Sequence, residues 1–342
     1  MIISRTPFRV SFLGGGSDLA AFYQRQRGAV LSTTIDKYMY ISVHPYFERD
    51  KILVKYSQTE KCSELAKLEH PLVRECLRRR NYLSGLEISS TADVPASTGL
   101  GSSSAFTVGL LHSLSAQRGQ FVAKNRLAEE ACQIEIDMVG SPIGKQDQYA
   151  TAYGGLNLIE FLSSGDVVVT PVSLTHEIIQ RLQRRLLMFY THAQRDANSI
   201  LADQQKQIAT EGKFRTQEKM VELAYDARDR LFEGNLDAFA RLMHTGWELK
   251  QRLSTKISNQ CINDAYERAL KAGAGGGKLL GAGGGGFLLL YCVEEKQDRL
   301  REELRDLQEL SFHFEFGGSQ IIFAYERDPA HESEQNPHDA AR

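Results

Sequence analysis

Residues 95–105 read PASTGLGSSSA, and this stretch predicts a phosphate-binding loop that opens a helix. Gly99 and Gly101 permit an unusual turn, because glycine adopts backbone conformations that other residues avoid. The three serines at 102–104 then stand at the start of an apolar segment with helical periodicity. The free N–H groups and positive dipole end of such a helix attract an anion, and serine hydroxyls can bind it or coordinate Mg²⁺. Helix capping by serine is the alternative, although it explains one serine better than three.

A second glycine-rich stretch, KLLGAGGGGFLLL, occupies residues 278–290. Its Gly281, Gly283 and Gly286 satisfy the G-x-G-x-x-G pattern of dinucleotide-binding turns. Such a turn must open a helix, whereas the segment that follows here is apolar and favours a strand. A Walker A loop also fails, because position 279 is Leu rather than Ser or Thr. A plain helix-to-strand turn remains possible, but we expect this backbone to lie close to the active site, against the loop at 99–104.

Composition and charge narrow the possible classes of function. The chain has 342 residues, which predicts about two domains, and its formal net charge of -2 gives no basic field for nucleic acid. Five cysteines occur without C-x-x-C spacing, so neither a zinc framework nor a disulfide scaffold is expected. The first residues lack a signal-peptide layout, and no stretch approaches the roughly 18 apolar residues of a membrane span. We therefore expect a cytoplasmic protein without nucleic-acid or membrane partners.

Strand and helix patterns alternate irregularly, which predicts an α+β fold rather than a doubly wound sheet. Strands are expected over 1–12 (broken by Pro7), twice or three times within 30–56, and over 86–94, 156–161, 167–172, 185–191, 287–293, 311–316 and 319–325. Helices are expected over 18–27, 73–80, 124–138, 196–272 with breaks, and 294–308, together with those after the loops at 95–105 and 140–155. The shift to helix near 180–195 predicts domains over 1–185 and 186–327, followed by a disordered tail at 328–342.

Three segments, in order along the chain, resemble the GHMP small-molecule kinases. They are RTPFRVSFLGGGSD at 5–18, the phosphate loop at 95–105, and the glycine-rich stretch at 278–290. The resemblance implies a ribosomal-S5-like N-terminal α/β domain that carries the phosphate loop, and a ferredoxin-like C-terminal α+β domain. It also implies ATP and Mg²⁺ as cofactors. ATP phosphate binding falls on Gly99, Leu100, Gly101, Ser102, Ser103 and Ser104.

A closer resemblance is to the branch of this family that phosphorylates C1 of D-glycero-D-manno-heptose 7-phosphate. It is carried by residues 5–18, 28–41, 145–157 and 276–290. The implied product is the 1,7-bisphosphate, an early step towards GDP-heptose for bacterial capsule, S-layer or related polysaccharide. Fucokinase and galactokinase remain alternative members, and a non-catalytic sugar and ATP sensor is a further alternative. A homodimer is possible.

The resemblance also implies which residues carry out the chemistry. Asp147 would accept the proton of, or orient, the anomeric hydroxyl, although it could equally cap the helix that begins near Gln148. Arg9 would lie beside Asp147 and hold it ionised or steady the moving phosphoryl group, with a surface ion pair as the alternative. Ser103 and Glu135 would bind Mg²⁺, unless Glu135 belongs to a solvated acidic face.

Sugar binding falls on Asp18, which could instead cap the next helix. Galactokinases carry an acid where this chain has Gly15, so galactose specificity is doubtful and a bulkier sugar would have room. The substrate site implied by the resemblance includes Gly16, Gly283 and Gly284. The distal phosphate of a sugar phosphate would need cations, for which Lys145, Lys37 and Arg195 are the candidates.

Overall fold

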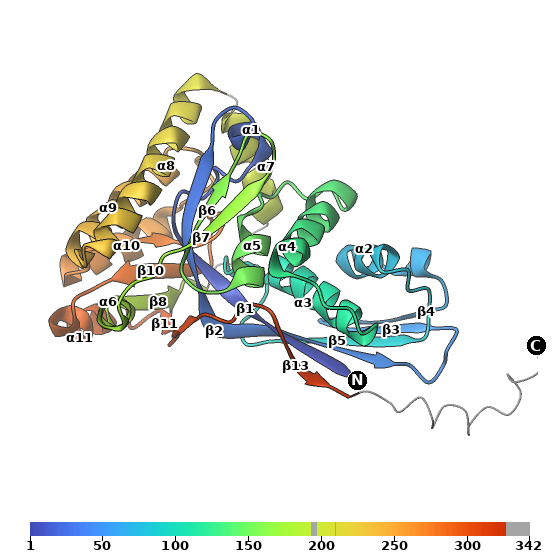
Figure 1. Cartoon of the computed structure of the whole chain (residues 1–342). Coiled ribbons are helices and arrows are strands. Elements are labelled where there is room, and N and C mark those ends of the chain that lie inside the picture. Colours follow the sequence, from blue (N-terminus) through green and yellow to red (C-terminus); the bar gives the residue numbers. More distant parts are fainter. Residues whose placement is uncertain (193–196, 209, 326–342) are drawn as a thin grey trace, which may run out of the picture.

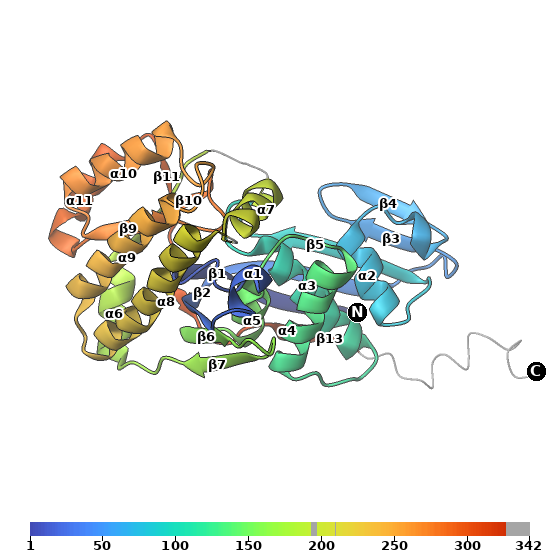
Figure 2. The same ribbon diagram turned by 90° about the horizontal axis from the view of Figure 1, so that it is seen from above.

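The computed structural model describes residues 1–192, 197–208 and 210–325. Within these residues the strands form one nine-stranded sheet and one four-stranded sheet, with helices packed around both (Figures 1 and 2). The α+β prediction is therefore confirmed. No helix in the described ranges is long and apolar enough to cross a lipid bilayer.

The large sheet is built on two long neighbouring strands, β1 (Ile2–Leu13) and β2 (Gly28–Pro45). The strands that join them are β3 (Ile52–Lys55), β4 (Thr59–Cys62), β5 (Leu86–Ala92), β6 (Asn157–Phe161), β7 (Val167–Pro171), β12 (Phe314–Glu315) and β13 (Gln320–Ala324). Their main order is β13-β1-β2-β5-β3-β4, in which only the β3–β5 pair is parallel. The predicted break at Pro7 is wrong, because a register shift between Pro7 and Phe8 lets β1 continue past a residue without an N–H.

Helices cover the large sheet and carry the residues at its functional end. They are α1 (Ala20–Tyr23), α2 (Pro71–Arg79), α3 (Ser102–Gln117), α4 (Lys124–Cys132) and α5 (Gln146–Tyr153). The central one, α3, packs on β1 and β2. The helix expected at 18–27 shortens to α1, and the one expected at 124–138 is α4 followed by a π-helical segment, η2 (Gln133–Met138).

The small sheet has the order β11-β8-β10-β9 and lies beside most of the C-terminal helices (Figure 2). Its strands are β8 (Leu186–Tyr190), β9 (Gly276–Leu279), β10 (Phe287–Tyr291) and β11 (Gln308–Glu309). The helices are α6 (His176–Arg184), α7 (Ala197–Ile208), α8 (Glu211–Phe232), α9 (Leu236–Gln251), α10 (Gln260–Ala272) and α11 (Gln297–Glu303). The pattern reading missed α6, which is short, and β9, whose glycines carry no strand signal.

The chain leaves the large sheet for the small one and then returns. Strands β12 and β13 follow the C-terminal helices in sequence but pair with β2 and β1. The outgoing and returning segments touch, because Leu310 N–H donates to the Met188 carbonyl at 2.8 Å and Phe314 N–H to the Gln183 side chain at 2.9 Å. The division at residue 185 stays a prediction, and the tail at 328–342 lies outside the described residues.

Candidate active site

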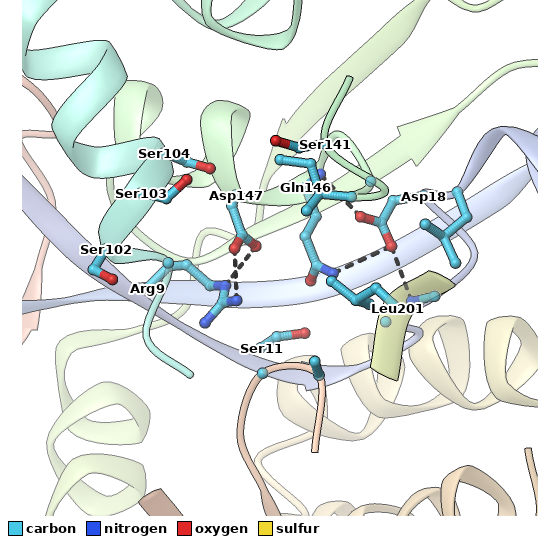
Figure 3. Close-up of a pocket in the computed structure, with 18 of the residues that line it drawn as sticks. Arg9, Ser11, Asp18, Ser102, Ser103, Ser104, Ser141, Gln146, Asp147 and Leu201 are labelled. Carbon is cyan, nitrogen blue, oxygen red and sulfur yellow. Dashed lines mark hydrogen bonds and ion pairs between the residues drawn. The ribbon is translucent and has the colours of Figure 1, made fainter. Parts of the chain in front are cut away.

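A cavity of about 440 Å³ opens where the two sheets and their helices meet. Its walls come from β1 and the glycine loop after it, the start of α3, the segment around residues 139–147, α7, α9 and residues 278–282. Figure 3 shows serines from α3 on one side, Asp147 and Arg9 in the middle, and Asp18 with Gln146 on the other side. These segments lie far apart in sequence, and the fold brings them to one place.

The phosphate loop and the C-terminal glycine stretch are in backbone contact. Gly99 has φ +85°, and a Cβ there would lie 2.6 Å from the Leu280 carbonyl oxygen. A Cβ on Gly281 would lie 2.5 Å from the Cα of Gly99. The expected apposition of the two stretches is confirmed, and a side chain at either position would push them apart.

The start of α3 presents the three serines to the cavity. Gly101 precedes the helix with φ +77°, a left-handed conformation that favours glycine. Ser102, Ser103 and Ser104 line the cavity, as does Gly101, whereas Gly99 and Leu100 lie behind this surface. The loop therefore offers a helix N-terminus and hydroxyl groups to a ligand, which suits a phosphate.

Arg9 and Asp147 form a two-pronged ion pair at the centre of the cavity. Arg9 Nε donates to Asp147 Oδ1 and Nη2 donates to Oδ2, each at 2.7 Å. Arg9 also donates to the Gly99 carbonyl and is only 4% exposed, so the pair does not lie on the surface. Asp147 lies in the first turn of α5 without capping it, and its carboxylate faces the cavity. Arginine fixes the position of this carboxylate.

Glu135 is completely buried, so it does not belong to a solvated acidic face. It accepts hydrogen bonds from Ser103, from Ser104 at 2.8 Å, from Thr107 at 3.2 Å and from Gln148. Burial raises the pKa of this carboxyl, and the hydrogen bonds from the two serines and Gln148 oppose that rise. Glu135 lies in the π-helical segment η2, while among its acidic neighbours Glu130 is also buried and Asp137 is exposed.

The pairing of Glu135 with Ser103 fits a Mg²⁺ ion. Ser103 lines the cavity while Glu135 does not, so the hydroxyl stands between the carboxylate and the space a ligand would fill. Mg²⁺ is usually held by one or two carboxylates, with waters and substrate phosphates as its other ligands. Across the described ranges no group of three or more His, Cys, Asp or Glu side chains could hold a metal ion. One carboxylate with serine hydroxyls would therefore hold Mg²⁺ only when phosphate oxygens supply further ligands.

Asp18 lines the opposite side of the cavity and does not cap the following helix. It accepts hydrogen bonds from the N–H of Gly16 at 2.9 Å and from the backbone and side chain of Gln146, each at 3.2 Å. Burial, followed by the nearby charge of Asp147, raises the pKa of Asp18. Gly15 and Gly16 also line the cavity, and a Cβ on Gly16 would clash with Gln204 Nε2, so a side chain does not fit there.

Three buried polar atoms in the wall of the cavity have no hydrogen-bond partner among the described residues. They are Ser11 Oγ, Gln146 Oε1 and Gln204 Nε2. A buried polar group without a partner is costly, so such atoms indicate a ligand that completes their hydrogen bonds. A molecule rich in hydroxyl groups would do so.

The predicted cations for a distal phosphate do not gather in this cavity. Lys145 donates to the Gly165 carbonyl at 2.7 Å and is not among the lining residues. Lys37 Nζ lies 3.4 Å from Asp36 Oδ1, and Lys37 does not line the cavity either. Arg195 lies outside the described residues. The direction in which these two lysine side chains point is set by packing, which a sequence pattern does not record.

The predicted contact through Gly283 and Gly284 is also displaced. A Cβ on Gly283 would lie 2.7 Å from the Ile257 carbonyl oxygen, and Gly284 N–H donates to that same carbonyl at 2.8 Å. Gly281 and Ala282 line the cavity instead. The middle of the glycine run therefore fixes the loop on its own domain, while its beginning faces the site.

Two lysines that motif reasoning missed line the cavity. Lys250 on α9 is 5% exposed and Lys278 on β9 is 6% exposed. Burial, with the nearby Arg9 guanidinium, lowers the pKa of Lys250 to about 8. Burial and the positive charge of Lys250 lower the pKa of Lys278 well below its usual range. For Lys278, its position directly before the glycine run could have indicated a place in the site. For Lys250, the sequence carries no such signal.

A second cavity of about 800 Å³ adjoins the first. The two share Ser97, Ser102 and Ser103 at the phosphate loop. Aromatic side chains contribute to its wall, and His70 and Phe106 are stacked there with ring centroids 5.0 Å apart. A space with aromatic side chains in its wall, beside a phosphate loop, suits a nucleobase.

Comparisons with known proteins agree with this arrangement. The family models for the GHMP kinases N terminal domain and the GHMP kinases C terminal match residues 68–155 and 227–309. The D-glycero-alpha-D-manno-heptose 7-phosphate kinase of Campylobacter jejuni is 27% identical over 92% of this chain and 96% of its own. The bifunctional fucokinase/GDP-fucose pyrophosphorylase of Arabidopsis thaliana is 27% identical over 88% of this chain and 31% of its own. The crystal structure of a D-glycero-D-manno-heptose 1-phosphate kinase from Bacteroides thetaiotaomicron superposes with a TM-score of 0.79 at 24% identity, covering 95% of this chain and 100% of that one.

Proposed function

The chain belongs to the GHMP family and is an ATP-dependent sugar kinase, and on that premise we propose that it phosphorylates C1 of D-glycero-D-manno-heptose 7-phosphate. The observation that carries the proposal is the Arg9–Asp147 pair, which lies between the phosphate loop and the hydroxyl-binding wall around Asp18. That order matches a donor phosphate, a reacting hydroxyl and the remainder of a sugar. The product would be the 1,7-bisphosphate, for use in GDP-heptose and surface polysaccharide synthesis.

The reaction follows from the positions of the groups. The C1 hydroxyl oxygen forms a bond to the γ-phosphorus of ATP while the bond from that phosphorus to the leaving ADP oxygen breaks. Asp147 accepts the hydroxyl proton, and Arg9 keeps its carboxylate aligned through the two hydrogen bonds. Positioning and charge stabilisation supply most of the catalysis in phosphoryl transfer.

The phosphate loop would hold the phosphates of ATP, with Gly101 and the three serines at the N-terminus of α3. Ser103 and Glu135 would hold Mg²⁺, which when bound neutralises charge on the phosphates. The nucleobase would occupy the second cavity, against His70 and Phe106. This arrangement directs the γ-phosphate towards Asp147.

A heptose 7-phosphate is favoured over other sugars by two observations. The Campylobacter jejuni relative, named for that activity, matches along nearly its entire length. Gly15 lines the cavity without a side chain, and three polar atoms without a partner among the described residues line the same wall, so a hydroxyl-rich sugar would complete their hydrogen bonds. The fucokinase relative keeps fucose as the second acceptor to be tested.

The test is a coupled assay of ADP release with ATP and Mg²⁺, using heptose 7-phosphate beside L-fucose, D-galactose and D-mannose. The expected result is saturable turnover with heptose 7-phosphate, and a product whose phosphorus NMR spectrum shows one primary and one anomeric phosphate. Turnover with only an unphosphorylated sugar would reject heptose 7-phosphate as the substrate but would leave the sugar kinase activity intact. Absence of turnover with every acceptor, together with tight ATP and sugar binding, would favour a sensor.

A further inference from the structure

The two buried lysines of the cavity, Lys250 and Lys278, have no role in the reaction described above. Lys250 Nζ donates to the carbonyl of Gly281, whose backbone abuts Gly99 of the phosphate loop. Lys278 lies on β9, three positions before Gly281, and within the described ranges it has no hydrogen bond or ion pair. Both ammonium groups therefore come from the small-sheet side to the place where that side meets the phosphate loop.

The charges already present do not neutralise these lysines. The ionisable lining residues are three cations, Arg9, Lys250 and Lys278, and two carboxylates, Asp18 and Asp147. Asp147 is held by both prongs of Arg9, and Asp18 receives its three hydrogen bonds from uncharged groups. With both lysines protonated, one positive charge is left over on side chains that are almost completely buried, where an unpaired charge is strongly disfavoured.

We propose that Lys250 and Lys278 together form a phosphoryl-binding site that takes a phosphate dianion between them. The inference rests on the proposed kinase function and assigns the residues that compensate the charge of its substrates. A bound dianion would satisfy both ammonium groups and reverse the excess of positive charge. Lysine acts on phosphate as a compact point charge with three donors, so it needs no fixed plane of approach.

Two phosphoryl groups could occupy the site: the γ-phosphoryl group of ATP during transfer, or the phosphate that the sugar carries. The position beside Gly281 and Gly99 favours the first, because Gly99 belongs to the phosphate loop. Lys250 also lies near Asp18 and Asp147, which is consistent with the second source, the phosphate of the sugar. Both sources have the same chemistry, and they can be separated by kinetics.

A structural role for the lysines predicts a different outcome from a ligand role. If the lysines held the two sides of the molecule together, replacing them would lower the thermal unfolding temperature of the free protein. If they await an anion, replacement by a flexible apolar residue removes a repulsion and leaves the unfolding temperature unchanged or raised.

The experiment uses Lys250→Met, Lys278→Met and the double variant, with Lys271→Met as the control because Lys271 is exposed on α10. For each, kcat and KM are measured with heptose 7-phosphate and with mannose at high concentration, and thermal unfolding is followed with and without AMP-PNP·Mg²⁺ or the sugar phosphate. The expected result is a loss of about 10²-fold or more in kcat for every acceptor in the double variant, with no loss of unfolding temperature.

A rise in KM confined to the phosphorylated sugar would equally support the site and assign it to the substrate's own phosphate. Unchanged kinetics in the double variant, or stabilisation by both ligands as large as in the wild type, would overturn it. Failure of the proposed function is distinct from either, because it appears as an inactive wild-type protein. The ligand-induced stabilisation then still reports whether the lysines bind phosphate.

Discussion

The two sides of the cavity handle charge in opposite ways. On the large-sheet side, Arg9 and Asp147 hold each other, and Glu135 accepts four hydrogen bonds from its neighbours. On the small-sheet side, Lys250 reaches only a carbonyl oxygen, and Lys278 has no polar partner within the part of the chain that the structure describes. The paired side is arranged before any ligand arrives, whereas the unpaired side is completed by one. Chemistry that needs fixed geometry is thus assigned to the first and charge compensation to the second.

Breaking the paired side should have the largest effect. Asp147→Asn keeps the size of the side chain but removes the proton acceptor and one member of the ion pair. We expect kcat to fall by about 10² to 10⁴-fold, while AMP-PNP·Mg²⁺ binds within about twofold of the wild type. Steady-state kinetics and calorimetry measure the two quantities. Asp137→Asn, on an exposed position of η2, is the matched control; equal activity in both variants would remove Asp147 from the mechanism.

The second-largest effect is expected at Glu135, whose carboxylate accepts hydrogen bonds from uncharged side chains. Glu135→Gln keeps the shape but removes the negative charge behind Ser103. We expect the concentration of Mg²⁺ needed for half-maximal activity to rise by about 10 to 100-fold, with kcat partly restored at high Mg²⁺. A titration of activity against Mg²⁺ measures this. A lower kcat with an unchanged Mg²⁺ requirement would instead make Glu135 a structural support for α3.

The third prediction concerns the unpaired side and the pH dependence of ligand binding there. Burial and Arg9 lower the pKa of Lys250 to about 8, against 10.5 when exposed, while Asp18 and Asp147 oppose that shift; the pKa of the neighbouring Lys278 is lowered as well. A bound phosphate favours the ammonium form and so raises the pKa of Lys250. Ligand binding near pH 8 should therefore take up protons, and affinity should fall by at most about tenfold per pH unit above pH 8. Calorimetry in buffers of different ionisation enthalpy measures the uptake, and Lys250→Met should reduce it.

The lowered pKa of Lys250 also affects the stability of the ligand-free protein, which should rise with pH where the affinity for the ligand falls. Between pH 8 and 10.5 the unfolded chain holds the Lys250 proton more tightly than the folded one, so this residue makes the fold more stable as pH rises. The difference in stability between the wild type and Lys250→Met should consequently narrow over that window. A difference that does not vary with pH would mean that Lys250 is not buried in solution.

The smallest effect is expected outside the cavity. Lys145 directs its ammonium group to the Gly165 carbonyl and lies 4.9 Å from the Tyr23 ring centroid. Lys145→Met should leave KM for the sugar phosphate within about twofold of the wild type, in contrast to Lys250→Met. A large rise in KM would place the distal phosphate at Lys145 and contradict the comparison.

Local motifs predicted much of the paired side. The phosphate loop at 95–105 has a glycine and serine pattern that specifies its own conformation, and Arg9 and Asp147 stand in segments that resemble known members of the family. The burial of Glu135 was harder to foresee, because its acidic neighbours in sequence range from buried to exposed and it lies in a π-helical segment. A sequence pattern does not record a change from α to π geometry.

The unpaired side could not be predicted from sequence. Lys250 stands between Leu249 and Gln251, which do not mark it as buried, and it becomes buried because α9 packs against β9 and β1. Lys145 stands beside the catalytic segment but points away from it. Proximity along the chain and proximity in space thus gave opposite answers for these two lysines, and long-range packing decided between them.

The return of the chain to the large sheet has a consequence for how specificity could change. The outgoing strand β8 and the segment entering β12 are hydrogen-bonded to each other, so the region between them enters and leaves the fold at one place. That region carries Lys250 and Lys278 but neither Arg9 nor Asp147. Substitutions confined to that region would therefore alter the anion that the site accepts, while the Arg9–Asp147 pair stays in place.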